Sequence, residues 1–442
     1  MKKQFQTMAF TPPPNKYIKI GDQITEGEDF RTLERYVEYK NCGFDIILFA
    51  GEDKYFGEDY QTSDLKMMLD LAEKANLKAI VFDERIMELT VNSKTSIINE
   101  RFGGDSDKFK SFVGECMKEY KLHPAFSGVS ILDEPFIGKV GVVKEITDAI
   151  HGIDKNATVH TCFLPWIQDM GMAENALPKG YDSPSDAYAK YIDDFTATGI
   201  GYYAYDAYPF GMYENKNVMT PGYIRNMQQV ALHSVKNKVP FIMCIQSFSS
   251  GEHDDYRRVD ESDLNWQSHL ALSFGCKGLW YYTYWRFTTQ GNKFSQPFAV
   301  MDHDGSKMLY EETQRNNALS KRLFDFLQDY EYSSSQVLTA PHDNPSMKGV
   351  VETDLGLVES YTATAPVLIN KMTGKNGDLY AFINLRDSFE KEINQISIKL
   401  KAPAQNLSVL VNGYKMTIRC EDGWLNFNLA PGEGLYLIQD KK

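Results

Sequence analysis

The sequence predicts an α/β protein, a (β/α)8 TIM barrel followed by a C-terminal antiparallel β-sandwich. Two observations lead to this fold class. Eight short apolar runs alternate with amphipathic segments up to about residue 330, and after about residue 335 short strand-like segments separated by turn signals replace them. We therefore expect a barrel domain over residues 1–335 and a β-sandwich domain over residues 336–442.

The expected barrel strands are apolar almost throughout, which is typical of parallel strands covered on both faces. Each run has about seven residues, an ordinary strand length. In chain order we expect strands at 6–12, 44–50, 78–84, 128–134, 157–163, 201–208, 240–246 and 278–284.

The intervening segments carry apolar residues at helical spacing, and the pair Ser63-Asp64 is a typical helix start. A doubly wound open sheet is the structural alternative, but it usually shows a Gly-rich phosphate turn, and we find none. We expect helices at 30–43, 63–77, 107–120, 142–153, 185–198, 223–237, 263–276 and 311–330.

The last hundred or so residues lack helical spacing, and the turn signals NG, DG and PGEG separate short apolar segments. This pattern is typical of an antiparallel sandwich. Strands are expected at 378–385, 395–402, 406–413, 416–421 and 434–440.

Composition narrows the function classes. The net charge of -13 argues against nucleic acid as a partner, and no 18-residue apolar run predicts a membrane span. The six cysteines show no CxxC spacing, so buried free thiols are expected rather than zinc ligands or disulfides. The start of the chain lacks the apolar core of a signal peptide, which fits a cytoplasmic protein or an exported one whose signal has been removed.

Two adjacent acids end the fourth expected strand, in GVSILDEPF. Barrel enzymes place their chemistry at the carboxyl ends of the strands, so Asp133 and Glu134 are candidate catalytic residues. By the same rule, Asp206 is a third catalytic candidate at the end of the sixth strand. The remaining candidates at strand ends, which we expect to contact substrate, are Gln246, Tyr205, Tyr208, Trp285, Tyr282, Tyr284, Asp83 and Arg85, with Glu52, Asp53 and Glu84 beside them.

Strand ends rich in carboxylates, Tyr and Trp suit the cleavage of a glycosidic bond. The reaction needs a proton on the departing oxygen and negative charge near an oxocarbenium-like centre, and two carboxyl groups with different pKa values supply both. The sequence shows no phosphate loop and no HxH or HExxH metal spacing. We therefore expect a glycoside hydrolase that acts on a carbohydrate with Glu134 as general acid/base, and without a cofactor or metal.

Three segments support this interpretation by resemblance. HPAFSGVSILDEPF resembles the strand-four motif of retaining barrel glycosidases, in which the Glu before Pro is the acid/base. WQSHLALSFGCKGLWYYTYW and PGEGLYLIQ are similar to the strand-eight region and the last strand of bacterial β-galactosidase-like glycosidases. The resemblance implies a nucleophilic Glu at the end of strand seven, where this chain has Gln246.

That departure leaves several mechanisms open. Tyr205-Asp206 and Trp285 resemble parts of chitinase sites, and an adjacent Asp-Glu pair resembles β-hexosaminidases, which implies a substrate-assisted route with Asp133 orienting an acetamido group. In an inverting route Asp206 would be the base, at a carboxyl separation of roughly 6.5–9.5 Å from Glu134. Acids on the following loop are weaker nucleophile candidates: Glu252, Asp254 and Asp255.

Other function classes compete with this one. Gln246 makes a non-catalytic carbohydrate-binding barrel a credible alternative. An aldolase or a metal-dependent hydrolase would show a strand-end lysine or a His cluster, and we find neither. The sugar, its anomer, exo or endo attack and the oligomeric state stay open.

Structural roles are also consistent with the same residues. Glu134 can cap a helix, Asp133 can pair with Arg85, and Asp206 can be a turn acid before Pro209. Gln246 can be a satisfied polar residue, and Trp285 can close the barrel. We expect His160 in the core and packing against helices for Tyr202, Tyr203 and Tyr281.

Overall fold

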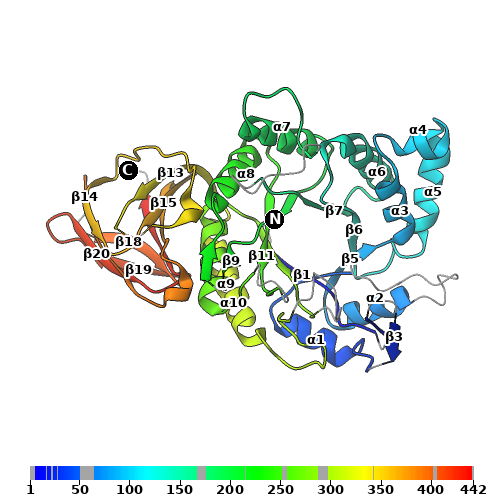
Figure 1. Cartoon of the computed structure of the whole chain (residues 1–442), viewed down its shortest axis with the longest axis horizontal. Helices are drawn as coiled ribbons and strands as arrows, with labels where there is room; N and C mark the ends of the chain where they lie inside the picture. The colour runs from blue at the N-terminus through cyan, green and yellow to red at the C-terminus, as the bar shows by residue number, and fades with distance from the viewer. Residues whose placement is uncertain are drawn as a thin grey trace.

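A computed structural model of the chain describes residues 5–15, 17–20, 23–26, 28–49, 64–166, 176–214, 216–250, 256–286, 297–341, 343–401 and 406–440. It shows a barrel enclosed by helices, with a smaller β domain beside α8, α9 and α10 (Figure 1). No helix in these described ranges is long and apolar enough to cross a membrane.

Eight parallel strands close the barrel, as the sequence predicted. They are paired in the order β1-β12-β11-β8-β7-β6-β5-β4. Every expected strand is present, and each begins and ends within two residues of its predicted bounds. Their bounds are β1 (Gln6–Phe10), β4 (Ile46–Leu48), β5 (Lys78–Phe82), β6 (Phe126–Asp133), β7 (Thr158–Phe163), β8 (Tyr203–Asp206), β11 (Phe241–Gln246) and β12 (Gly278–Tyr282).

Strand alternation explains the continuous apolar runs. One set of side chains fills the inside of the barrel, where Leu48, Ile80, Ala204, Ile242 and Trp280 belong to one buried cluster. The residues between them point to the helices and join the larger core. Both faces of each strand are therefore buried.

The helix layer contains every expected helix and two that we did not predict, α3 and α4. α3 begins directly after β5 because the Asp83 side chain accepts a hydrogen bond from the Arg85 N–H and caps it. The bounds are α1 (Leu33–Asn41), α2 (Asp64–Lys74), α3 (Glu84–Asn92), α4 (Ile97–Phe102), α5 (Ser106–Lys118), α6 (Val140–Ile153), α7 (Pro184–Thr196), α8 (Tyr223–Asn237), α9 (Glu261–Ser273) and α10 (Tyr310–Leu327). Ser63, the expected cap of α2, lies outside the described residues.

Two hairpins extend the barrel loops: β2 (Tyr17–Ile20) with β3 (Gln23–Glu26), and β9 (Phe210–Tyr213) with β10 (Lys216–Met219). The sequence analysis missed both, since each strand has only four residues and lies beside stronger barrel signals. The second hairpin follows β8 directly and so belongs to the carboxyl end of the barrel.

The C-terminal part is an antiparallel β-sandwich, as predicted. A six-stranded sheet in the order β13-β15-β16-β21-β18-β19 accompanies a three-stranded sheet in the order β14-β17-β20, and residues of both sheets share one buried cluster. Strand β13 already starts at residue 330, so the expected boundary after residue 335 falls inside it. The bounds are β13 (Tyr330–Leu338), β14 (Val358–Ala363), β15 (Val367–Gly374), β16 (Gly377–Asn384), β17 (Asn394–Leu400), β18 (Asn406–Val411), β19 (Tyr414–Arg419), β20 (Trp424–Leu429) and β21 (Gly434–Asp440).

Helix α9 joins the two parts and is buried along most of its length. Two of its side chains form hydrogen bonds with the C-terminal domain. The Trp266 indole N–H donates to the Asn384 carbonyl oxygen (3.1 Å), and His269 Nδ1 lies 2.9 Å from the Tyr436 hydroxyl. Gly432, with φ +78°, comes so close to α9 that a Cβ there would lie 2.1 Å from the Ser262 carbonyl oxygen. The barrel and the sandwich therefore share a tightly packed interface.

Candidate active site

A β-bulge sets the direction of Asp133 at the end of β6. The pairing of β6 with β7 slips by one residue between Ser130 and Leu132, so that Asp133 lies opposite Cys162, a residue of the barrel interior. Without the slip Leu132 would take that position. Bulges re-aim side chains in this way, and here the bulge presents a carboxylate at the carboxyl end of the barrel.

Glu134 follows in a strained backbone conformation, with φ +43°. Its N–H donates to the Cys162 carbonyl oxygen (2.8 Å), and the Tyr191 hydroxyl of α7 donates to the carbonyl oxygen of Pro135 (2.6 Å). A non-glycine residue in this region costs roughly 1–3 kcal/mol, and such strain clusters at functional sites. The side chains of Asp133 and Glu134 are both exposed to solvent.

Asp206 ends β8 and belongs to the same inward-facing set as Ala204. It pairs with Cys244 of β11, and it is only partly exposed. Its Oδ1 atom is buried and has no hydrogen-bond partner among the described residues. An unsatisfied buried carboxyl oxygen requires an explanation, and a proton or a bound ligand group would satisfy it.

The pKa values of all three carboxyl groups are raised, and the charges of neighbouring acids contribute at Asp206 and Glu134. Burial and the charges of Glu134 and Asp133 raise the pKa of Asp206 to about 7, while the Cys162 thiol and the Tyr208 hydroxyl act in the opposite direction. Surrounding protein atoms and the Asp133 charge raise the pKa of Glu134. Desolvation likewise raises the pKa of Asp133, although the Glu134 N–H and the Cys162 thiol favour its ionised form. The set of three carboxyl groups therefore retains a proton near neutral pH, with Asp206 as its main site.

Two thiols flank Asp206 inside the barrel, Cys162 and Cys244. Both are buried, and burial together with the Asp206 charge raises the pKa of each thiol, so both stay protonated and can donate. This agrees with the expectation of buried free thiols, which holds for all six cysteines. No local sequence pattern indicates that two of them border the acids.

Aromatic rings gather at the same end of the barrel. Tyr208 and Tyr282, both expected to contact substrate, are partly exposed and pack edge-on against Phe248, with ring centroids 4.9 and 5.2 Å away. Phe10 lies 5.4 Å from Tyr282, and Tyr256 lies 5.5 Å from Tyr208. The sequence analysis missed these last two rings and Phe248, because two of the three follow their strand rather than ending it.

The structure gives Gln246 a structural role. It is fully buried; its Oε1 accepts from the Phe210 N–H (3.1 Å), and its Nε2 donates to the carbonyl oxygens of Phe210 (3.1 Å) and Arg257 (3.2 Å). Both ends of the amide are thus engaged by main chain, as in the satisfied-residue interpretation. No part of the Gln246 side chain is exposed to solvent in this arrangement.

Arg257, whose carbonyl oxygen accepts a hydrogen bond from Gln246, also contacts the C-terminal domain with its side chain. The Arg257 guanidinium is buried over the Phe210 ring and forms two bonds with the buried carboxylate of Asp263, at 2.6 and 2.7 Å. It also lies 3.2 Å from Asp387, and the hydroxyl of Ser388 donates to Asp263. The sandwich domain therefore fixes a segment that follows β11 at the carboxyl end of the barrel.

Three aromatic candidates are buried away from solvent. Tyr205 faces the helix layer and is fully covered. Tyr284 packs edge-on against Tyr39 of α1 (4.6 Å), and Trp285 packs against Phe30 (4.9 Å). Each is at most 1% exposed, so the expected substrate contacts of Tyr205, Tyr284 and Trp285 have no basis in this geometry.

Asp83 and Arg85 are engaged with one another rather than with a site. Besides capping α3, the buried Asp83 accepts a hydrogen bond from the Tyr120 hydroxyl (3.0 Å) and pairs with Arg85 (2.9 Å). Arg85 also pairs with Glu119 at 3.2 Å. This arrangement supports a structural role for both residues in place of the predicted substrate contact.

The remaining expectations agree with the structure in part. His160 is a core residue, as predicted: its Nδ1 lies 2.9 Å from the Tyr202 hydroxyl, and burial lowers its pKa to about 3. Tyr203 and Tyr281 face the helices, whereas Tyr202 joins the barrel interior. Five loop acids lie outside the described residues: Glu52, Asp53, Glu252, Asp254 and Asp255.

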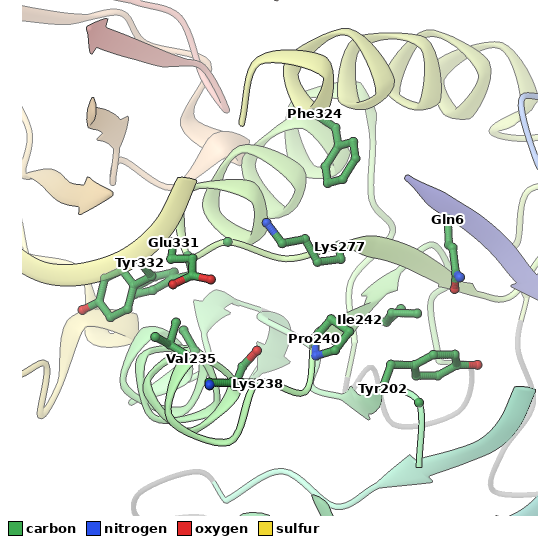
Figure 2. A pocket seen from close by; sticks show the side chains of 15 residues that line it. Gln6, Tyr202, Val235, Lys238, Pro240, Ile242, Lys277, Phe324, Glu331 and Tyr332 are labelled. Atoms are coloured by element: carbon green, nitrogen blue, oxygen red, sulfur yellow. The ribbon is translucent and has the colours of Figure 1, made fainter. Parts of the chain in front are cut away.

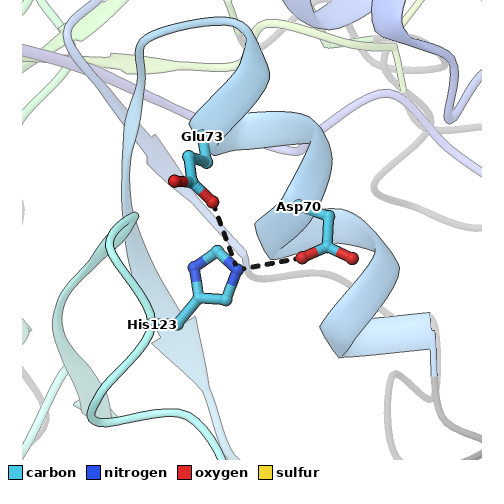
Figure 3. Close-up of side chains that lie close together, drawn as sticks. All are labelled: Asp70, Glu73 and His123. Carbon is cyan, nitrogen blue, oxygen red and sulfur yellow. Dashed lines mark hydrogen bonds and ion pairs between the residues drawn. The ribbon is translucent and has the colours of Figure 1, made fainter.

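A surface group elsewhere has metal-ligand residue types. Within the described parts of the chain, Asp70 and Glu73 of α2 lie beside His123 (Figure 3). The Nε2 atom of His123 is 3.1 Å from Asp70 and 3.8 Å from Glu73. His123 Nδ1, however, accepts a hydrogen bond from the Ala125 N–H (3.1 Å), which places the ring proton on Nε2. A protonated nitrogen has no lone pair for a metal, so Nε2 donates a hydrogen bond to Asp70, and Glu73 is a nearby carboxylate.

Comparison with known proteins supports the fold. No family model and no curated protein matches the chain. Among solved structures, the α-amylase of Geobacillus thermoleovorans in complex with acarbose matches over 100% of this chain and 99% of its own, with a TM-score of 0.55 and 12% identity. An Anoxybacillus α-amylase matches over 99% and 98% (TM-score 0.52, 12% identity), and a protein described as a glycoside hydrolase over 96% and 97% (0.51, 10%).

These similarities extend over the barrel and the C-terminal domain together. The chain therefore has the architecture of (β/α)8 glycoside hydrolases with a C-terminal β domain, as the sequence resemblance implied. At 10–12% identity the likeness concerns the fold. Fold alone does not assign an activity, which has to be argued from the carboxyl groups.

Proposed function

We propose that the chain is a glycoside hydrolase in which Glu134 is the general acid/base and Asp206 is the second carboxyl group. The observation that carries the proposal is that carboxyl groups from the ends of β6 and β8 lie together at the carboxyl end of a closed parallel barrel, where burial and the charges of Glu134 and Asp133 raise the pKa of Asp206. Pairs of acids whose environments shift their pKa values are typical of glycosidic cleavage.

In this proposal Glu134 donates a proton to the departing glycosidic oxygen. The negative charge of Asp133 favours the protonated form of Glu134 before the reaction. Protonation of the leaving oxygen breaks the bond to the anomeric carbon, and the departing alcohol keeps that proton. Tyr208 and Tyr282 offer partly exposed rings, which suit the apolar C–H faces of a sugar.

The reaction is completed in one of two ways. In the first, Asp206 as a carboxylate takes a proton from the water that attacks the anomeric carbon, which inverts the configuration. In the second, Asp133 orients a 2-acetamido oxygen of the substrate, which attacks in place of water. Strands β6 and β8 are separated by β7 alone, so their ends are about 10 Å apart, or two strand spacings. Side chains that reach inward from such positions are compatible with the carboxyl separation of roughly 6.5–9.5 Å that inversion requires.

The second candidate is a carbohydrate-binding barrel without catalysis. The observation in its favour is the engagement of Gln246 by main chain at the end of β11, where similar retaining enzymes have their nucleophile. The two candidates differ in their response to Glu134→Gln. A hydrolase loses turnover and keeps sugar affinity, whereas a binding protein shows no turnover before or after the change.

The test is a panel of aryl glycosides that includes N-acetylhexosaminides, assayed with the wild type, Glu134→Gln and Asp206→Asn. The proposal expects turnover of at least one substrate and its loss in both variants, with unchanged far-UV circular dichroism. Glu119→Gln, on the surface near Arg85, is a matched control that should keep full activity. Wild-type rates in Glu134→Gln would exclude the proposed role.

A further inference from the structure

A cavity of about 630 Å³ (Figure 2) lies beside the amino ends of β1, β8, β11 and β12, whereas the carboxylates lie at the carboxyl ends of the strands. Gln6 of β1 and Ile242 of β11 line it, together with Tyr202 and Lys277, which directly precede β8 and β12. The proposed chemistry uses only carboxyl ends, so this cavity belongs to a different face. Its volume lies within the range of small-molecule sites, roughly 300–1,000 Å³.

Helix α8 forms one wall with a single face. Ala231, Ser234 and Val235 of α8 line the cavity at spacings of three and four residues, which is one stripe of an α-helix, and Lys238, the residue that follows the helix, continues the wall. Val235 is 38% exposed on this wall, beside the buried Ala231. The helix thus presents two apolar side chains and the Ser234 hydroxyl to the cavity.

The opposite walls are apolar as well. Phe324 of α10, Tyr332 of β13 and Phe274 line the cavity together with Pro240 (Figure 2). Tyr202 forms part of the floor, and its hydroxyl is bonded to His160 inside the barrel. The floor therefore offers rings and aliphatic carbons to an apolar group.

Charged groups border these apolar walls. The Lys277 ammonium lies 3.4 Å from the Tyr330 carbonyl oxygen and 5.7 Å from the centre of the Phe324 ring. Lys238 is exposed at the end of α8, and Glu331 is exposed on β13. Two ammonium groups against one carboxylate make the lining net positive on a chain whose net charge is -13. Such a local reversal of sign favours an anion.

We propose that this cavity is a second binding site, independent of the proposed catalytic one, for a small amphipathic anion with an apolar ring and a carboxylate. The ring would lie between the α8 stripe and Phe324, and the carboxylate would contact the Lys277 ammonium. The apolar walls supply most of the affinity, and the lysines supply the preference for a negative charge.

The test uses 1-naphthoate and its neutral analogue 1-naphthamide as probes, titrated into the full chain by calorimetry. We expect saturable binding of naphthoate at one site, about fivefold or more tighter than naphthamide, as one partly exposed ion pair provides. Lys277→Met, which keeps the apolar stem, should remove that preference and leave naphthamide binding unchanged.

A matched pair on α8 locates the site. Val235→Trp fills the cavity and should abolish binding of both probes, while Leu232→Trp, an exposed position of the same helix outside the lining, should have no effect. Equal affinity for the two probes, or binding that survives Val235→Trp, would overturn the proposal. Glycosidase turnover should be unchanged in both Trp variants, so the outcome does not depend on the proposed function.

Discussion

The amide of Gln246 holds the main chain of Phe210 from both sides, accepting its N–H and donating to its carbonyl oxygen at 3.1 Å each. The end of β11 is the place where the sequence resemblance to retaining barrel glycosidases implies a nucleophilic Glu. In this chain the position instead anchors the strand β9 to β11. A change back to Glu is therefore a test of structure as much as of chemistry.

Gln246→Glu should destabilise the protein without creating a nucleophile. The new carboxylate would be buried and would face the carbonyl oxygens of Phe210 and Arg257. We expect a loss of about 3 kcal/mol or more in the free energy of unfolding at pH 8, measured by urea denaturation. Gln246→Met, which loses the hydrogen bonds but adds no charge, should lose less, about 1–3 kcal/mol. A stable Glu variant with increased turnover would contradict this role.

Asp206→Asn should stabilise the protein in alkaline solution. The pKa of Asp206 is raised to about 7 in the folded state, against about 3.9 in the unfolded chain. Between these values the folded state holds more protons than the unfolded state, so wild-type stability falls as the pH rises from about 4 to 7. The Asn variant lacks this loss, and we expect a gain of ~2 kcal/mol at pH 8 that vanishes near pH 4.

Asp193 provides a control of opposite sign for that comparison. Burial opposes its ionisation, but hydrogen bonds from Lys236, Asn237 and His233 lower its pKa to about 2. Asp193→Asn should therefore lose stability above pH 4 and should lose less as the pH falls toward 2. Urea denaturation of both variants at pH 4 and pH 8 checks the two signs in one experiment. Equal responses would contradict the assigned environments.

Arg257→Met should loosen the junction between the barrel and the sandwich. The change leaves the buried Asp263 carboxylate without its bidentate partner, which costs roughly 3–5 kcal/mol. Asp387→Asn removes only the peripheral partner and should cost about 1 kcal/mol or less. Thermal unfolding followed by circular dichroism measures both. A small effect of Arg257→Met would show that this ion pair does not hold the segment after β11.

Tyr282→Ala should weaken substrate binding more than it slows the chemistry, if the exposed ring contacts the sugar. We expect KM to rise about tenfold, equivalent to ~1.4 kcal/mol, with a small change in kcat. Tyr284→Phe is the matched control, because Tyr284 is buried beside Tyr39 and should not affect KM. Steady-state kinetics on the best aryl glycoside measures both. A change in KM for Tyr284→Phe alone would reverse the assignment.

Much of the fold could be predicted because barrel strands are buried on both faces. That burial leaves runs such as FIMCIQ and KAIVF, which single-sequence reasoning recognises. The short hairpins β2-β3 and β9-β10 have no such composition. Helix α3 was missed because Asp83 and Glu84 look like a strand end, whereas Asp83 caps the helix.

The candidate site could be predicted in part, because the positions of strand ends can be read from the sequence. The positions of Asp133, Glu134 and Asp206 follow from the strands. The directions of side chains do not: Tyr205 and Tyr284 lie one residue out of phase with the inward set and face helices. The bulge that turns Asp133 inward and the main-chain bonds of Gln246 depend on strand pairing and tertiary contacts, which carry no local signal.

The proposed role of Glu134 is tested most directly by kcat/KM for a chromogenic glycoside, measured with wild type and Glu134→Gln at the same pH. We expect a fall of about 10²–10⁴-fold, the usual contribution of a general acid, in a variant that unfolds at the wild-type urea concentration. Equal kcat/KM values in the two proteins would contradict it.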